Sequence, residues 1–349
     1  MNLRAPCIAL LLTTPLLSRE KTDLIIMNNG DHITGEIKGL DAGVLYVSLD
    51  YVSGTISFQW SKVAHLESKQ LFIVKTEDGS VYTGSLKGAE TRAGRPVQIQ
   101  VAETPEKKLL IDSSRIVLMS ETSENFWQRF SGEVSFGTIY SKGNQSTQYN
   151  LNSEAEYLRA RWSADGSYSS TLSSSSGTSP STRNQLNLSF RHLLPWNNYF
   201  YSALASFRQS SEQDIRLQTI VGGGIGRYLK NNNHAIIAVL GGLAWQSTNY
   251  TPATVVPATQ NLAGALIGAE VQFFKFSKTN LNVTATLFPA LSEPGRVLFN
   301  TNASYYIKIF GNLSWNISFY GNWDSQPPAH LSGSDYGSSS GLTWTFGLK

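Results

Sequence analysis

Apolar and polar residues alternate from Phe126 onward, in segments of about ten residues separated by polar turns. In residues 313–319, Leu, Trp, Ile and Phe occupy every second position, with Ser or Asn between them. A period of two places the two sets on opposite faces of a β-strand. Many such strands in succession predict an all-β, antiparallel transmembrane barrel, in which one face of each strand contacts lipid and the other faces the lumen.

Twelve strands fit this part of the chain, and single-chain bacterial barrels have even numbers of strands. The final segment, residues 342–349, has the apolar alternation that the barrel-assembly machinery reads, although it ends in Leu-Lys rather than Phe. The predicted strands are residues 130–142, 146–158, 162–173, 184–194, 199–210, 215–229, 235–247, 260–274, 280–289, 296–309, 313–323 and 340–348.

Short and long connections alternate between the predicted strands. The long ones are rich in Ser, Pro and Gly, and we expect them on the extracellular side. The short ones and both termini are then expected in the periplasm. Short connections are predicted at residues 159–161, 195–198, 231–233, 277–279 and 310–312, and long ones at 173–183, 249–259, 289–295 and 324–336.

Composition favours a barrel over a soluble β-sandwich or a helical membrane protein. Charged residues make up 15% of the chain, against about 25% in soluble globular proteins. After the N-terminus there is no apolar run of the roughly 20 residues that a transmembrane helix needs. A soluble sandwich would also alternate, but here large aromatic residues recur at the ends of the apolar faces, as in the interfacial girdles of membrane barrels. They are Trp162, Trp196, Tyr199, Tyr201, Trp245, Tyr305, Trp315, Trp323 and Trp344.

Residues 1–20 are predicted to be a secretory signal peptide. Arg4 supplies a positive start, and residues 8–17 form an apolar stretch that is too short to span a bilayer. The one cysteine, Cys7, lies in this segment, so the mature chain would hold neither a disulfide nor a thiolate metal site. We therefore expect export, with the next part of the chain in the periplasm.

Residues 21–122 contain two related units, 21–70 and 71–122. Asn29-Gly30-Asp31 in the first unit corresponds to Asp78-Gly79-Ser80 in the second, and Thr-Gly and Lys-Gly pairs follow both at the same spacing. Asn-Gly and Asp-Gly pairs accept the positive φ of tight hairpins, which explains these glycines better than phosphate binding does. The short strands predict a duplicated SH3-like or Sm-like β module in front of the barrel, which occupies 123–349.

The opening of this module, residues 23–35, resembles the L-x-NGD-x-x-TG start of the domain of unknown function 481 (DUF481) family. Residues 55–63 resemble the next block of those proteins, and residues 141–147 resemble their first barrel hairpin. The match covers essentially the whole mature chain. Members are labelled salt-induced outer membrane proteins, so the resemblance implies an outer-membrane location and this architecture. It implies no catalytic residue.

Nine polar residues fall on the predicted lumen faces of the strands. Carboxylates and cations that share a barrel interior form either a selectivity ring for a solute or a set of salt bridges that closes the lumen. The sequence leaves both possibilities open. The candidate lumen-lining residues are Asn152, Glu154, Glu156, Asp165, Arg191, Arg208, Glu270, Lys308 and Asp324.

The sequence favours a non-enzymatic outer-membrane barrel of the Gram-negative envelope, with passive transport or an envelope-structural role. We expect outer-membrane lipid and, during biogenesis, the barrel-assembly machinery as partners. With a net charge of +3 we expect no nucleic acid, and we expect no cofactor or metal. The alternative is a barrel hydrolase acting on lipid, which needs a serine beside a histidine. His192 has no serine two residues later, and the glycine run 222–226 predicts close strand packing rather than a phosphate loop.

Overall fold

The computed structural model describes residues 21–52, 54–88, 97–102, 108–122, 130–141, 146–159, 161–177, 179–195, 197–251, 258–275, 279–328 and 331–346. The predicted signal peptide and Trp196 of the predicted girdles lie outside these residues. Across the described ranges, no helix is both long and apolar enough to cross a membrane.

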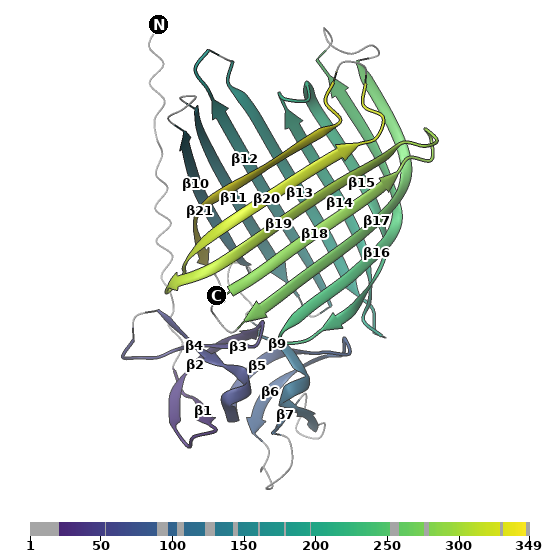
Figure 1. Cartoon of the computed structure of the whole chain (residues 1–349). Coiled ribbons are helices and arrows are strands. Elements are labelled where there is room, and N and C mark those ends of the chain that lie inside the picture. The colour runs from purple at the N-terminus through teal and green to yellow at the C-terminus, as the bar shows by residue number, and fades with distance from the viewer. Residues whose placement is uncertain are drawn as a thin grey trace, which may run out of the picture.

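Twelve antiparallel strands form a closed barrel in the C-terminal part of the chain, as predicted (Figure 1). Each strand pairs with its neighbours in sequence, and residues 132–136 of the first strand close the ring on residues 342–346 of the last. The strands are β10 (Phe130–Ser141), β11 (Ser146–Leu158), β12 (Trp162–Ser174), β13 (Ser181–Leu193), β14 (Tyr199–Ser210), β15 (Ile215–Asn231), β16 (Ala235–Tyr250), β17 (Thr259–Lys275), β18 (Thr279–Pro289), β19 (Val297–Phe310), β20 (Leu313–Asp324) and β21 (Ser334–Phe346).

The start of the last strand differs most from the prediction. It was expected at residue 340, but β21 begins at Ser334. Residues 334–339 are Ser, Asp, Tyr and Gly without apolar alternation, so the sequence pattern is that of a loop. They become a strand because they pair with β20, from Trp323 opposite Ser334 to Phe319 opposite Ser338. The end of the predicted loop 324–336 is therefore wrong.

The outward faces of the strands form the predicted apolar surface. On β20, Trp315, Ile317 and Phe319 are 39–43% exposed, whereas Asn316 between them is 3% exposed. The aromatic residues gather toward the two ends of the barrel, as expected for interfacial girdles. Trp162, Tyr199, Tyr201, Tyr305, Trp315 and Trp344 lie toward one end, and Trp245 and Trp323 toward the other.

The predicted duplication in the front module appears as a repeated order of elements. The boundary expected at residue 70 falls inside one long strand that serves both units. The first unit comprises β1 (Asp23–Met27), β2 (His32–Asp41), β3 (Val44–Ser48), β4 (Thr55–Gln59), the 3-10 helix η1 (Trp60–Lys62) and the start of β5 (Val63–Thr76). The second comprises the end of β5, β6 (Val81–Gly88), β7 (Gln98–Ala102), β8 (Lys108–Asp112), the 3-10 helix η2 (Ser113–Arg115) and β9 (Ile116–Glu121).

The two units share one hydrophobic core. Strands β1, β2, β9 and β5 pair in a closed ring, and β9 joins the second unit to β2 of the first. Ile25 and Leu66 of the first unit belong to the same buried cluster as Phe72 and Met119 of the second. Each such side chain stabilises the fold by about 1.5–3 kcal/mol through its burial. Because the cluster spans both units, we expect them to unfold together.

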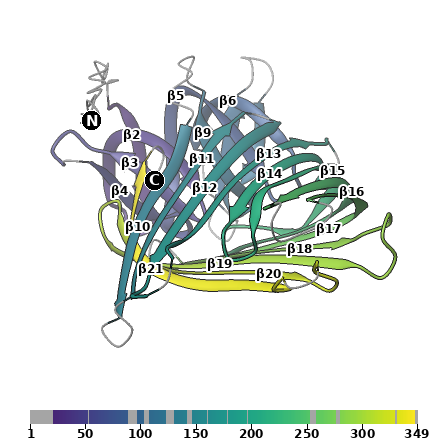
Figure 2. The same ribbon diagram turned by 90° about the horizontal axis from the view of Figure 1, so that it is seen from above.

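The barrel has two different ends (Figures 1 and 2). The turns β11–β12, β13–β14 and β15–β16 lie on the side of the front module, which we call the module end. The connections β12–β13, β16–β17, β18–β19 and β20–β21 lie on the opposite side, which we call the loop end. The predicted long connections thus lie away from the module, whereas a short connection, residues 211–214 between β14 and β15, also occurs at the loop end.

The strand phase predicts different costs for two neighbouring substitutions in the middle of β20. Phe319→Arg places a charge on the lipid face and should destabilise the barrel by about 2–4 kcal/mol. Ser318→Arg places the same charge on the inward face, where the Ser318 hydroxyl lies 3.3 Å from that of Ser304, and should cost far less. Refolding titrations in lipid vesicles measure both, and equal losses would contradict the assigned phase.

Candidate functional site

All nine candidate lumen residues lie on the inward faces of their strands. In each case the neighbouring residue along the strand faces outward. Arg208, for example, is 7% exposed and follows the outward-facing Phe207. Asp324 follows Trp323, which is outward-facing and 48% exposed. The charged members fall into two groups, one near each end of the barrel. Asn152, Glu154, Glu156, Asp165, Arg191, Glu270 and Lys308 lie in the middle or toward the module end, and Arg208 and Asp324 toward the loop end.

The module-end group is centred on an ion pair that crosses the lumen. Arg191 of β13 places a guanidinium nitrogen 2.6 Å from Glu270 Oε2 of β17, although these strands are not neighbours. A second guanidinium nitrogen donates to the Tyr228 hydroxyl of β15 at 3.2 Å. Asp165 of β12 accepts a hydrogen bond of 2.7 Å from Ser189. The interior at this level is therefore bridged by side chains.

A second bridge at the same end joins β19 to β10. The Tyr306 hydroxyl donates a hydrogen bond of 2.6 Å to Glu133 Oε1. Glu154 lies within electrostatic reach of Tyr306, and Glu156 within reach of Tyr228. Carboxylates from β10, β11, β12 and β17 thus concentrate negative charge at the module end of the lumen.

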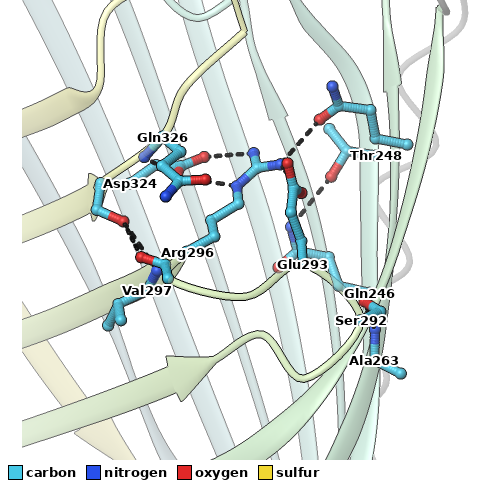
Figure 3. A network of polar contacts seen from close by, with 12 residues as sticks. Gln246, Thr248, Ala263, Ser292, Glu293, Arg296, Val297, Asp324 and Gln326 are labelled. Carbon is cyan, nitrogen blue, oxygen red and sulfur yellow. Dashed lines mark hydrogen bonds and ion pairs between the residues drawn. The ribbon is translucent and has the colours of Figure 1, made fainter.

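Arg296 organises the loop-end group (Figure 3). It lies in the β18–β19 connection, and its side chain is only 2% exposed. Two of its nitrogens donate to both Asp324 oxygens at 3.0 and 2.6 Å, and the third donates to Glu293 at 2.8 Å. Such bidentate pairs are directional and strong. The Arg296–Asp324 pair holds the β18–β19 connection against the end of β20.

Arg183 of β13 makes the second ion pair of this group, with Asp335 of β21. Its guanidinium also donates to Gln185 at 2.8 Å and lies 4.0 Å from the centre of the Tyr320 ring. Arg208 lies close by. Its Nε and Nη1 are buried and have no hydrogen-bond partner within the described ranges.

One sector of the lumen is apolar. The inward faces of β14 to β19, from the middle of the barrel toward the loop end, carry a contiguous hydrophobic cluster. The glycine run on β15 lies beside it: a Cβ at Gly224 would be 2.7 Å from Gly242 Cα, which supports the predicted close packing. The cluster comprises Ala244, Leu262, Leu266, Phe288, Ala290 and Leu298, flanked by Leu204, Ile220 and Leu240.

A cavity of about 330 Å³ opens at the loop end. Small-molecule sites have volumes of about 300–1,000 Å³, so this cavity is large enough for a small solute. Its lining is polar and includes Arg183, Glu212, Tyr320 and Asp335. Most of its other residues carry hydroxyl or amide groups, namely Gln148, Thr171, Ser173, Ser181, Thr182, Ser210, Ser332 and Ser334.

The front module contacts the turns at the opposite end of the barrel. Asn198, in the β13–β14 turn, donates to the Glu77 carbonyl at 2.6 Å, and Asn233, in the β15–β16 turn, donates to the Ile116 carbonyl at 2.8 Å. Asn198 has a φ of 59°, which asparagine tolerates better than most residues. Gly79 packs so closely that a Cβ there would lie 2.5 Å from Asn198 Oδ1.

Two charged residues of β5 and its hairpin lie at this contact. Burial lowers the pKa of Lys75, and Glu156 at the module end of the lumen acts in the opposite direction. Burial would raise the pKa of Asp78, but hydrogen bonds from Thr76 and Ser80, together with Arg115, hold it below its ordinary value. The ionised form of Asp78 therefore stabilises the folded β5–β6 hairpin, and this contribution is lost as the pH falls through the lowered pKa.

Sequence reasoning missed several members of these groups. Arg183 and Asp335 were placed in loops, because their flanking residues are Ser, Gly and Asn rather than apolar. Glu133 and Tyr306 lie in predicted strands, and continuing the alternation along those strands would have identified them. Lys75 belongs to the other domain, and nothing in its sequence context indicates that it lies near Glu156 of the barrel.

The described residues bring no hydrolase constellation together in the lumen. His192 lies on the outward face of β13, opposite Trp162, and His65 of the front module lies 3.1 Å from Glu67. Ser332, two residues beyond His330, donates its hydroxyl to the Ser334 carbonyl at 2.7 Å, and His330 itself is outside the described ranges. Across the same ranges, no group of three His, Cys, Asp or Glu side chains could hold a metal ion.

Comparison with known proteins gives one family match and several distant structural likenesses. The family described as "Protein of unknown function, DUF481" matches residues 134–346. The translocator domain of the autotransporter NalP from Neisseria meningitidis is 12% identical, with 62% of this chain and 86% of that chain covered and a TM-score of 0.32. The COG4313 outer membrane channel from Pseudomonas putida F1 is 10% identical, with 62% and 93% covered and a TM-score of 0.35. No curated protein matches in sequence.

The Arg191–Glu270 bridge should behave as a coupled pair. Removing one partner leaves the other charge unpaired inside the barrel, so Arg191→Met alone should destabilise by about 1–3 kcal/mol. This is less than for a fully buried pair, because the Arg191 side chain is 28% exposed. The double variant Arg191→Met with Glu270→Met should recover part of the loss. Guanidinium unfolding in detergent measures this cycle, and strictly additive losses would contradict the bridge.

Proposed function

The chain belongs to the DUF481 family, whose description assigns no function, and we propose that it forms a passive outer-membrane channel for small polar solutes. The observation that carries this proposal is the polar inward face on β10–β13, β20 and β21. There Asn187 is hydrogen-bonded to Ser167 and Ser206, and Ser135 lies 3.3 Å from Asn316. Hydroxyl and amide groups can exchange such bonds with water and solutes, whereas a sealed apolar interior cannot.

The charged groups at the two ends would act as filters on this path. Carboxylates outnumber cations at the module end, and arginines from β13, β14 and the β18–β19 connection converge at the loop end. Rings of charge select ions and small solutes in pores. Because the bridges Arg191–Glu270 and Tyr306–Glu133 cross the lumen, they narrow the path, and we expect a low conductance.

The front module would control the other mouth of the channel. Its contacts with the β13–β14 and β15–β16 turns, and the position of Lys75 near Glu156, place it over the module end. An envelope-structural role is the second candidate, and the cross-lumen bridges favour it, since they also suit a closed barrel. The two candidates differ in conductance.

We further propose that the module and the short turns are periplasmic. An epitope tag between Ser325 and Pro327, in the β20–β21 connection, should be stained on intact cells. A tag at Asn231, in a turn of the module end, should be stained only after the outer membrane is permeabilised. Staining of the Asn231 tag alone on intact cells would reverse the orientation.

If the barrel conducts solutes and the module covers one of its mouths, then weakening the contact between module and barrel should raise the conductance. Gly79→Leu places a side chain at a φ of +83°, where even a Cβ would collide with Asn198. Gly30→Leu is the matched control, because Gly30 has the equivalent turn position and a φ of +89° but nothing within 4 Å. Single-channel recording in planar bilayers should show a larger or more frequent current for Gly79→Leu than for Gly30→Leu and the native chain.

The double variant Asn198→Gly with Asn233→Ala tests the same contact without backbone strain, because glycine accepts the positive φ of position 198. It removes two hydrogen bonds between module and barrel and should change the current in the same direction as Gly79→Leu. If none of these proteins conducts current in planar bilayers although the barrel is shown to be inserted and folded, the envelope-structural role is favoured instead.

A further inference from the structure

The loop end of the lumen holds a buried cation that the protein does not neutralise by a direct contact. Arg208 is 7% exposed, and its Nε and Nη1 donate to no partner in the described part of the chain. Buried arginines are normally paired, because a guanidinium removed from water without a partner destabilises the fold. Arg183 and Arg296, at the same end, follow this rule.

The acceptors around Arg208 are committed to other arginines. Gln185, opposite Arg208 on β13, accepts from Arg183. Asp335 also pairs with Arg183, and both oxygens of Asp324 accept from Arg296. The charged and titratable groups within electrostatic reach of Arg208 are Arg183, Asp335, Tyr250 and Asp324. The neighbouring carboxylates Asp335 and Asp324 are therefore engaged by other arginines, and Arg208 has no ion pair of its own among the described residues.

Two further unpaired polar atoms lie close to Arg208 in the sequence. The Ser210 hydroxyl is fully buried and the Gln213 carbonyl oxygen is buried, and neither has a hydrogen-bond partner in the described ranges. Together with Arg208 they form a cluster within six consecutive residues at the end of β14 and in the following turn. Such groups are normally satisfied, so a cluster of them beside a cavity points to a bound ligand.

The cavity gives the ligand its size and its second chemical property. Ser210 and Arg183 line the 330 Å³ cavity, whereas Arg208 and Gln213 line a smaller adjoining hollow of about 30 Å³, and Ser332 lines both. The rest of the cavity lining consists mainly of serine and threonine hydroxyls, with the Tyr320 ring and the carboxylates of Glu212 and Asp335. Hydroxyl groups exchange hydrogen bonds with a polyhydroxylated ligand, while Arg208 needs an anion.

We infer that the loop-end cavity binds a small sugar acid, with its carboxylate on Arg208 and its hydroxyl groups on the Ser and Thr lining. Arg208 Nε and Nη1 would donate to the carboxylate in the charge-assisted manner that arginine favours. This inference rests on the proposed channel function, because it names the solute class that enters from the loop end. Its test measures binding in detergent and needs no current, so the two proposals can fail separately.

The test is isothermal titration of the full chain in detergent with galacturonate, galactose and inorganic phosphate as probes. Galacturonate should bind, and galactose, which has the same ring without the carboxylate, should bind at least about tenfold more weakly. Arg208→Gln should weaken galacturonate binding by at least about tenfold, because it removes the charge-assisted bonds. Arg216→Gln is the control, since Arg216 is exposed and its loss changes the net charge equally.

A melting curve guards against misfolding of the variant. Without ligand, Arg208→Gln should melt no lower than the native chain, because it replaces an unpaired buried charge. Galacturonate should raise the melting temperature of the native chain and of Arg216→Gln but not that of Arg208→Gln. Three results would overturn the inference: no binding of galacturonate, equal binding by Arg208→Gln, or Arg208-dependent binding of phosphate alone.

Discussion

Backbone hydrogen bonding in lipid is the constraint on which the rest of this structure depends. No water reaches the hydrocarbon core, and each unpaired N–H or C=O there costs several kcal/mol, so a sheet must close on itself. The ring closes where β10 meets β21, through five residue pairs among the described residues, against twelve between β10 and β11. Glycine makes this approach possible: a Cβ at Gly341 would lie 2.5 Å from the Phe136 carbonyl oxygen.

Closure fixes what the interior contains. Every second residue points inward, so the polar half of each alternating segment lines a narrow lumen and its charges must find partners there. Arg191 meets Glu270, Arg296 meets Asp324, and Arg183 meets Asp335. Arg208 makes no such ion pair among the described residues, and it lies beside the loop-end cavity. The ion pairs thus support the barrel, and the unpaired cation is the feature best suited to recognising a solute.

Sequence reasoning was sufficient wherever a single strand carries the information. The alternation with a period of two predicts where the strands lie and that Trp315 and Phe319 face outward. It also predicts that Arg191 and Glu270 face inward. It does not reveal that these two residues meet, because β13 and β17 are brought together only by the shape of the closed barrel. The first residues of β21 were missed for a related reason: pairing with β20, rather than their own composition, makes them a strand. The Asn198 and Asn233 contacts depend on how two domains dock, which no local pattern encodes.

Substituted-cysteine labelling along β12 tests most directly whether the lumen is a water-filled polar path. The sequence has one cysteine, Cys7, within the predicted signal peptide, so introduced cysteines can be read individually. A membrane-impermeant cationic thiol reagent added to intact cells should modify Ser173→Cys and Ser169→Cys on the inward face. It should leave the outward variants Leu172→Cys and Tyr168→Cys largely unmodified. Inward cysteines that react no faster than outward ones would contradict a solute path through this barrel.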